Sequence, residues 1–348
     1  MYLSAETLDD LLSKVYKRLL RRRGANEISP RKGAATEIFG VLLQITNPRA
    51  RLSRTELKST FYSCVGEFLW YLSGTNKLDF IEYYIREYVK SSDDKETIYG
   101  AYGPRLFSLN GIDQVDNVIK LLRAWPNSRR AVIQLFRAED LATDLKSSLK
   151  DIPCTCTLQF SVRRGQLQML TMMRSNDAYK GLPHDVFAFT MLQELMARKL
   201  GVEVGTYRHA VGSFHLYAQD VEKAAEYLEE GVQARVPMPA MPHGDQHTFI
   251  EMLLEAEEDI RQGRRPRIAQ MHPYWADLAR LLQVYRYTIK PSKAHRERIE
   301  RIKNQMHSDV YDIYIEKRER RKAVPVPLEQ SLFPPGELDT PSPDASPE

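Results

Sequence analysis

The sequence contains little cysteine and little net charge. Three cysteines, Cys64, Cys154 and Cys156, occur among 348 residues. An odd and sparse set does not make a disulfide framework, and a zinc site needs more cysteine or histidine at tight spacing. We therefore expect no metal site and a reducing, cytoplasmic location. The formal net charge is +4, which argues against a protein that coats nucleic acid.

Long apolar runs and glycine-rich phosphate loops are also absent. No run of about 18 apolar residues occurs, so we expect no membrane-spanning helix. The first residues include Glu6, Asp9 and Asp10, whereas a secretory signal begins with basic residues and continues with an apolar stretch. The absence of a Walker or dinucleotide loop removes the commonest nucleotide-binding folds. The apolar fraction of 43% nevertheless allows a sizeable core.

Hydrophobic periodicity predicts a mixed set of helices and strands. Helical patterns cover 5–23, 59–73, 114–124 and 185–200, and strand patterns cover 36–47, 131–136 and 206–217. A β-hairpin turns at Arg163-Arg164-Gly165. Because strands and helices do not alternate regularly, the order favours an α+β fold over a doubly wound sheet. Beyond residue 219 charged helical segments dominate, over 219–232, 247–262, 273–286 and 292–322.

The segment around Pro153-Cys154 holds the first candidate chemistry. A cysteine after proline, at the entry to a strand, can form an activated thiolate if arginines surround it. Cys156 follows two residues later, and the pair could instead be a fragment of a metal site or two small buried side chains. Taken alone, the segment favours the last interpretation.

Glu67 is the second candidate, because it lies in the apolar and aromatic segment 59–73. An unpaired carboxylate is costly inside such a helix. Further polar motifs follow in order along the chain: Tyr102-Gly103, Arg129-Arg130, Arg174-Ser175-Asn176-Asp177, Gly181-Leu182-Pro183-His184-Asp185 and Gly212-Ser213-Phe214-His215-Leu216-Tyr217.

Over residues 28–220 this ordered series resembles the thymidylate synthase superfamily. Each motif alone is weak, but the set is specific in its order and spacing. The resemblance implies an α+β sandwich, with helices packed on a mixed sheet, that dimerises through the sheet. It also implies that a cysteine thiolate adds to C6 of a pyrimidine nucleoside monophosphate, so that C5 accepts a one-carbon unit from 5,10-methylenetetrahydrofolate.

The resemblance assigns catalytic roles to four residues. Cys154 becomes the nucleophile because it follows the proline, and Glu67 orders water and relays protons at the base. Tyr102 lies near the C5 proton, and Asp177 lies at the pyrimidine ring. A thiolate needs nearby cationic donors, and Arg174 can serve that purpose.

The resemblance also assigns the residues that bind the nucleotide. The phosphate is held by Arg31, Arg129, Arg130, Arg174 and Ser175, with Arg129 and Arg130 donated across the dimer interface. Guanidinium groups suit this task because they make bidentate, charge-assisted hydrogen bonds. His215 and Tyr217 bind the sugar hydroxyl. Without the resemblance, Arg129-Arg130 would be a solvated surface pair and His215 an ordinary histidine.

Three departures from thymidylate synthases concern the base and the product. Asp185 replaces their asparagine, Thr155 replaces the histidine after the cysteine, and residues 90–101 contain no tryptophan. Asparagine offers one donor and one acceptor, which match uracil, whereas a carboxyl group that shares a proton with N3 matches cytosine. The first two departures resemble the deoxycytidylate hydroxymethylase branch. In thymidylate synthases the tryptophan of this loop lies against the folate. Without it, water would add to the methylene carbon attached to C5 before hydride transfer, and the product would be 5-hydroxymethyl rather than 5-methyl.

We therefore predict a folate-dependent C5 hydroxymethylase that acts on a cytidine monophosphate and works as a homodimer. The alternatives are a thymidylate synthase that converts dUMP to dTMP, and a catalytically silent nucleic-acid or partner-binding protein with this fold. The predicted regions are a thymidylate synthase-like catalytic domain over 1–235, a helical extension over 236–322 and a disordered proline-rich tail over 323–348. The sequence leaves ribose and deoxyribose undistinguished.

Overall fold

The computed structural model describes residues 1–21, 24–30, 33–56, 60–289 and 293–320. Arg31 and the predicted tail over 323–348 lie outside these residues. The strands are β1 Tyr2–Ala5, β2 Asn26–Ile28, β3 Ala35–Ile45, β4 Val132–Gln134, β5 Thr155–Arg163, β6 Gln166–Asp177 and β7 Glu203–Tyr217. The helices are α1 Leu8–Leu20, α2 Phe61–Leu72, α3 Leu78–Tyr84, α4 Tyr102–Phe107, α5 Gln114–Ala124, α6 Ala138–Ser147, α7 Gly181–Leu200, α8 Val221–Glu229, α9 His247–Gln262, α10 Pro273–Ile289, α11 Lys293–Lys303 and α12 Asp312–Arg320.

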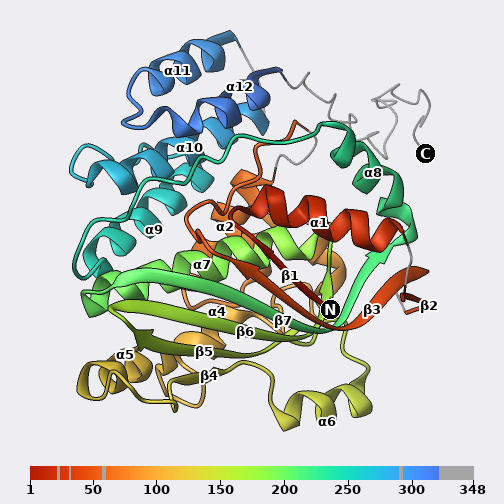
Figure 1. Cartoon of the computed structure of the whole chain (residues 1–348). Helices are drawn as coiled ribbons and strands as arrows, with labels where there is room; N and C mark the ends of the chain where they lie inside the picture. The colour runs from red at the N-terminus through yellow and green to blue at the C-terminus, as the bar shows by residue number, and fades with distance from the viewer. Residues whose placement is uncertain (22–23, 31–32, 57–59, 290–292, 321–348) are drawn as a thin grey trace, which may run out of the picture.

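The described strands form one mixed sheet in the order β1-β3-β7-β6-β5-β4. β2 pairs with the first three residues of β3. β6 and β7 run parallel, whereas β5 and β6 form the predicted antiparallel hairpin. Helices α1, α2 and α7 lie on one face of this sheet (Figure 1). The α+β fold with helices packed on a mixed sheet is confirmed.

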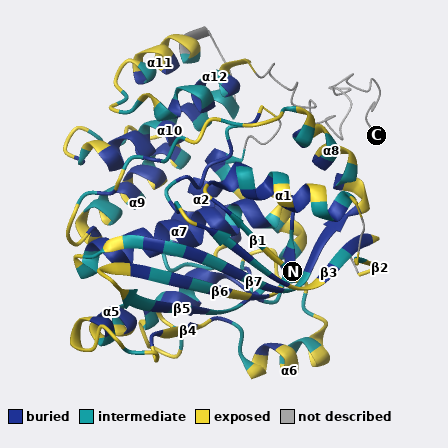
Figure 2. Ribbon diagram, in the orientation of Figure 1, coloured by how far each residue is buried: buried dark blue, intermediate teal, exposed yellow. Residues whose placement is uncertain are grey.

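Helix α7 is the centre of the core, between the sheet and α2. It is apolar on most sides, and it is dark along nearly its whole length in Figure 2. A helix with apolar residues all round is stable only when other elements cover it on all sides. The helix ends as predicted at Gly201, which takes the left-handed conformation that glycine tolerates best. The functional motifs lie at its beginning and on the strands beneath it.

The helices of the C-terminal part pack onto α2 rather than standing apart. α10 contacts α2, and the ring of Phe61 lies 4.8 Å from that of Tyr314. Lys317 of α12 donates to the backbone carbonyls of Arg54 and Thr55, just before α2. A boundary at residue 235 stays a prediction.

The charged segment predicted to be helical over 292–322 contains two helices. Its described residues form α11 and α12, separated by a short 3-10 turn at Asp309–Tyr311. The Asp277 carboxylate accepts hydrogen bonds from the backbone N–H groups of His307 and Ser308. Ser308 in turn caps the new turn through its hydroxyl. Side chains that satisfy backbone donors in this way stabilise a break in the helix.

Candidate functional site

The pairing of β5, β6 and β7 brings the motifs of the site together. The backbone N–H of Arg174 on β6 donates to the carbonyl of Cys154 at 2.9 Å, which fixes the start of β5 beside the Arg-Ser-Asn-Asp motif. On the other side of β6, Asp177 is paired with His215 of β7. Residues that are about 60 positions apart in the chain therefore share one end of the sheet.

Cys154 lies against the guanidinium group of Arg174. Arg174 Nη2 is 3.8 Å from Cys154 Sγ, and the same side chain donates to the carbonyls of Pro153 and Ile152 at 3.0 and 3.1 Å. A cationic donor beside sulfur stabilises the thiolate, which is the nucleophilic form. Burial raises the pKa of the Cys156 thiol. This geometry favours Cys154 over Cys156 as the nucleophile.

Tyr102 is tied to the residue that follows the cysteine. Its hydroxyl oxygen accepts hydrogen bonds from the backbone N–H and the side-chain hydroxyl of Thr155, at 3.0 and 2.9 Å. Burial raises the pKa of the Tyr102 phenol well above its usual value, so the phenol keeps its proton. That proton is therefore free to donate to another group. Thr155 therefore links the strand that begins beside Cys154 to the Tyr102 phenol.

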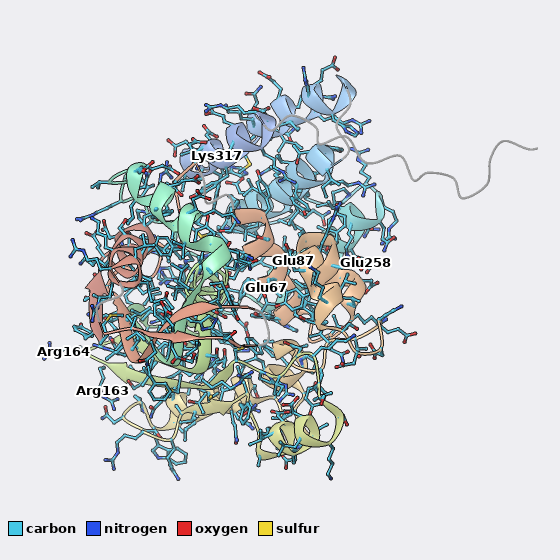
Figure 3. The ribbon with its side chains drawn as sticks, turned by 90° about the vertical axis from the view of Figure 1, so that its right-hand side faces the viewer. Glu67, Glu87, Arg163, Arg164, Glu258 and Lys317 are labelled. Atoms are coloured by element: carbon cyan, nitrogen blue, oxygen red, sulfur yellow. The ribbon has the colours of Figure 1, made fainter. Side chains whose placement is uncertain are left out.

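Glu67 is buried in α2, and Figure 3 places it in the interior, far from Arg163 and Arg164 at the β5–β6 turn. The hydroxyl of Tyr88 donates to Glu67 Oε1 at 2.5 Å. Tyr88 belongs to the 3-10 turn Arg86–Ser91, and its ring packs edge-on against Trp70 at 5.4 Å. An aromatic side chain therefore lies beside the buried carboxylate, just before the window 90–101 that contains no tryptophan.

Asp185 is the fifth residue of α7 and is only 9% exposed. Its Oδ2 accepts a hydrogen bond from Asn176 Nδ2 at 2.7 Å. Burial, together with the nearby Glu67 carboxylate, raises the pKa of Asp185 to about 8. At neutral pH the group is therefore mostly a neutral carboxylic acid, which offers both a donor and an acceptor.

Asn176 begins a chain of buried hydrogen bonds that leads away from Asp185. Asn176 Oδ1 is 3.0 Å from His209 Nε2, and His209 Nδ1 is 2.8 Å from the hydroxyl of Tyr207. Asn176, His209 and Tyr207 are 4%, 1% and 0% exposed. Burial lowers the pKa of His209 to about 3, so its imidazole is neutral.

The remaining polar residues cluster at the same end of the sheet. Asp177 Oδ1 accepts from the backbone N–H groups of Tyr179 and Lys180, which fixes the turn into α7. The rings of His215 and Tyr217 meet edge-on, with centroids 4.8 Å apart. A carboxylate, an imidazole and a phenol thus gather at this end of the sheet.

Comparison with known proteins matches this arrangement. The family model described as thymidylate synthase matches residues 13–257, which is more than half of the chain. The chain belongs to the thymidylate synthase family. Two curated relatives are the deoxyuridylate hydroxymethyltransferases of Bacillus phage SP01 and Delftia phage PhiW-14.

These relatives match only in part. The first is 31% identical over 224 residues, which cover 61% of this chain and 56% of the relative. The second is 29% identical over 235 residues, which cover 65% of each. This chain therefore spans just over half to just under two thirds of the length of these relatives.

Two of the predicted phosphate ligands lie apart from the thymidylate synthase motifs gathered here. Arg129 and Arg130 are exposed and precede β4, at the edge of the sheet. The backbone carbonyl of Arg129 accepts from Gln159 Nε2, further along β5 than Cys154. Arg31 lies outside the described residues. Of the predicted phosphate ligands, Arg174 contacts Cys154, and Ser175 follows it on β6, where it pairs with Ser213 of β7.

Sequence reasoning missed four residues of the site. Tyr88, Asn176, His209 and Tyr207 are polar groups that contact Glu67 or lead to Asp185. Asn176 lies inside a motif that the sequence displays, between Ser175 and Asp177. A histidine within an alternating strand was the available signal for His209.

No group of three or more metal-ligating side chains gathers within the described part of the chain. None of the helices there is long and apolar enough to cross a membrane. Trp70 Nε1 is buried with no hydrogen-bond partner among the described residues, and it lies beside Tyr88 and the Glu67 carboxylate.

Proposed function

We propose that this protein transfers a one-carbon unit from 5,10-methylenetetrahydrofolate to C5 of a pyrimidine nucleoside 5′-monophosphate and releases a 5-hydroxymethyl product. The observation that carries the proposal is Cys154, held against the Arg174 guanidinium in a chain of this family. The product follows the two relatives, both of which are named hydroxymethyltransferases. We further propose a cytidine nucleotide as the preferred substrate, because of Asp185.

The reaction begins with Cys154. Its thiolate forms a bond to C6 of the pyrimidine, and the electron pair of the C5–C6 double bond moves to C5. Arg174 and Ser175 hold the phosphate, while His215 and Tyr217 hold the sugar hydroxyl, so that C6 is aligned with sulfur. Arg174 serves both the phosphate and the sulfur because its guanidinium has five N–H donors.

Proton transfers at the base fall to Glu67 and Tyr102. The folate, when bound, supplies the carbon at the level of formaldehyde, so no reductant is needed for a hydroxymethyl product. C5 would form a bond to the one-carbon unit, and the bonds from that carbon to the folate nitrogens would break, so that tetrahydrofolate would be the leaving group and its nitrogens would take up the protons lost from C5 and from water. The C5 proton leaves toward the Tyr102 side of the ring, and Glu67 holds the water whose hydroxyl ends on the new exocyclic carbon. The thiolate then leaves C6 and the double bond returns. Tyr88 is the partly exposed aromatic group bonded to Glu67 that would meet the pterin, and the buried ring of Trp70 packs edge-on behind it.

The base preference rests on the protonation of Asp185. Cytosine presents an acceptor at N3 and a donor at the 4-amino group. A neutral carboxyl donates its proton to N3 and accepts from the amino group, so both are satisfied. Asp177, the last residue of β6, completes the polar surroundings of the pyrimidine ring.

A homodimer completes the phosphate site in this proposal. Phe39 on β3 and Met172 on β6 are exposed apolar side chains of the sheet, and Arg129 and Arg130 are exposed at its edge. Apolar side chains that solvent would otherwise cover favour association of two sheets. Each subunit would then donate Arg129 and Arg130 to the site of its partner, and Arg31 would add a further guanidinium.

The test is to incubate the purified protein with methylenetetrahydrofolate and each of dCMP, CMP and dUMP, and to determine product masses. We expect a 5-hydroxymethyl cytidine nucleotide as the main product. The second candidate is hydroxymethylation of dUMP, which the names of both relatives favour. A 5-methyl product from dUMP would instead identify a thymidylate synthase. No turnover of any nucleotide would contradict the proposal and leave a binding protein with this fold.

A further inference from the structure

A buried chain of polar side chains ends on the carboxyl group that is proposed to read the base. It runs from Tyr207 through His209 and Asn176 to Asp185, with distances of 2.8, 3.0 and 2.7 Å between bonded atoms. All four residues are at most 9% exposed. Apolar side chains would fill such a space at lower desolvation cost, so the hydrogen bonds call for an explanation.

The hydrogens of this chain point toward Asp185. A neutral imidazole carries one N–H, and His209 Nε2 faces an acceptor, Asn176 Oδ1. His209 Nε2 is therefore the donor, and Nδ1 accepts from the Tyr207 hydroxyl. Asn176 Nδ2 then donates to Asp185 Oδ2. In the reverse direction the Asp185 carboxyl would donate its single proton to Asn176. Both carboxyl oxygens could then only accept hydrogen bonds from the base.

This direction removes an ambiguity of the carboxyl group. A carboxylic acid can carry its proton on either oxygen, and can therefore present its donor and acceptor in either order. An unrestrained Asp185 could match the N3 and C4 edge of cytosine or that of uracil. The donor from Asn176 makes Oδ2 the accepting oxygen and leaves the proton on Oδ1. A carboxyl with a fixed order of donor and acceptor discriminates as an amide does.

We propose that Asn176 and His209 are positioning residues that fix the hydrogen-bonding direction of the Asp185 carboxyl and thereby select the pyrimidine base. This inference rests on the proposed function, because it requires that Asp185 meets the base. It does not depend on which base the wild-type protein prefers.

The test compares the binding and turnover of dCMP and dUMP by the full chain. Asn176→Leu and His209→Leu remove the donors at similar volume, whereas His209→Gln keeps an N–H near the position of Nε2. Gln193→Leu is the matched control. Gln193 is a fully buried polar residue of α7, the helix that carries Asp185, and its amide N–H group donates to the backbone carbonyls of Leu167 and Gly205 rather than to Asp185.

We expect both variants that lack the donor to lower the ratio of kcat/KM between the two nucleotides, and the ratio of their dissociation constants, by about tenfold. The His209→Gln and Gln193→Leu variants should keep both ratios within about twofold of wild type. If a leucine variant does not fold, Gly181→Ala replaces it. An added Cβ at Gly181 would lie 2.9 Å from Asn176 Nδ2 and would displace the amide without removing a polar group.

Unchanged ratios in folded Asn176 and His209 variants would overturn the inference, and so would an equal loss of selectivity in Gln193→Leu. A wild-type preference for dUMP would contradict the proposed cytidine substrate. The present inference would still be tested, because it concerns how far each variant changes the ratio of kcat/KM between dCMP and dUMP from the wild-type ratio. If no nucleotide is turned over, the ratio of dissociation constants, measured by calorimetry, tests the inference by the same criteria.

Discussion

The protonation of Asp185 predicts how the stability of the protein depends on pH. The pKa of about 8 in the folded protein lies about four units above the usual value for aspartate. Between these two pKa values the unfolded chain has released this proton and the folded chain keeps it, so stability falls as pH rises. Asp185→Asn cannot lose a proton and removes this contribution.

The size of the effect follows from linkage. Each pH unit within the window changes the free energy of unfolding by about 1.4 kcal/mol. Between about pH 5 and pH 7.5 the wild-type protein should therefore lose about 3 kcal/mol relative to Asp185→Asn. Other groups titrate in both proteins and cancel in the difference. Urea unfolding across this range, followed by tryptophan fluorescence, measures it.

Asp140→Asn is a control of opposite sign. Burial opposes ionisation of Asp140, but hydrogen bonds from Arg105 and from the backbone of Arg137 outweigh it and lower the pKa of that carboxyl. Its contribution to stability is present above the usual pKa and is lost as pH falls toward the lowered one.

A stability difference for Asp185→Asn that stays constant from about pH 5 to 7.5 would show an ionised carboxylate, and the argument for cytosine would fail.

Three further predictions concern the reaction. Cys154→Ser should abolish tritium release from C5 of the nucleotide, whereas Cys156→Ser should keep most of it; the reverse result would move the nucleophile to Cys156. Tyr88→Phe removes the hydrogen bond to Glu67 and should lower kcat by about tenfold at unchanged melting temperature; an unchanged kcat would show that this bond is only structural. Arg129→Ala should weaken nucleotide binding, and mixing it with Cys154→Ser protein should restore part of the activity; no recovery despite verified subunit exchange would contradict shared sites.

Local patterns predicted two of the helices closely, and they gave no sign of α3, α4 or α6. Residues 114–124 and 247–262 form α5 and α9 with the expected bounds. For α5 the apolar stripe was clear and Asp113 caps the first turn through its side chain. The short strand β1 escaped prediction because its four residues are ordered by parallel pairing with β3, which no local pattern signals.

The same distinction between local patterns and distant pairing applies to the candidate site. Motifs such as Arg174-Ser175-Asn176-Asp177 are contiguous, so the sequence displayed them, and the strand pairing placed them beside Cys154. The bond between Tyr88 and Glu67 joins residues 21 positions apart, and that between His209 and Asn176 joins residues 33 apart. Such contacts depend on tertiary packing, which propensity and periodicity do not encode.

The C-terminal helices bear on how this protein can be shortened or cleaved. The ring of Phe61 at the start of α2 packs on Tyr311 and Tyr314, and that of Tyr62 packs on Tyr285. A chain cut after residue 257, where the family match ends, would leave these two rings of the helix that carries Glu67 facing water. Because these rings pack on the helix that carries Glu67, we expect removal of the later helices to destabilise α2 and the side chains that it positions.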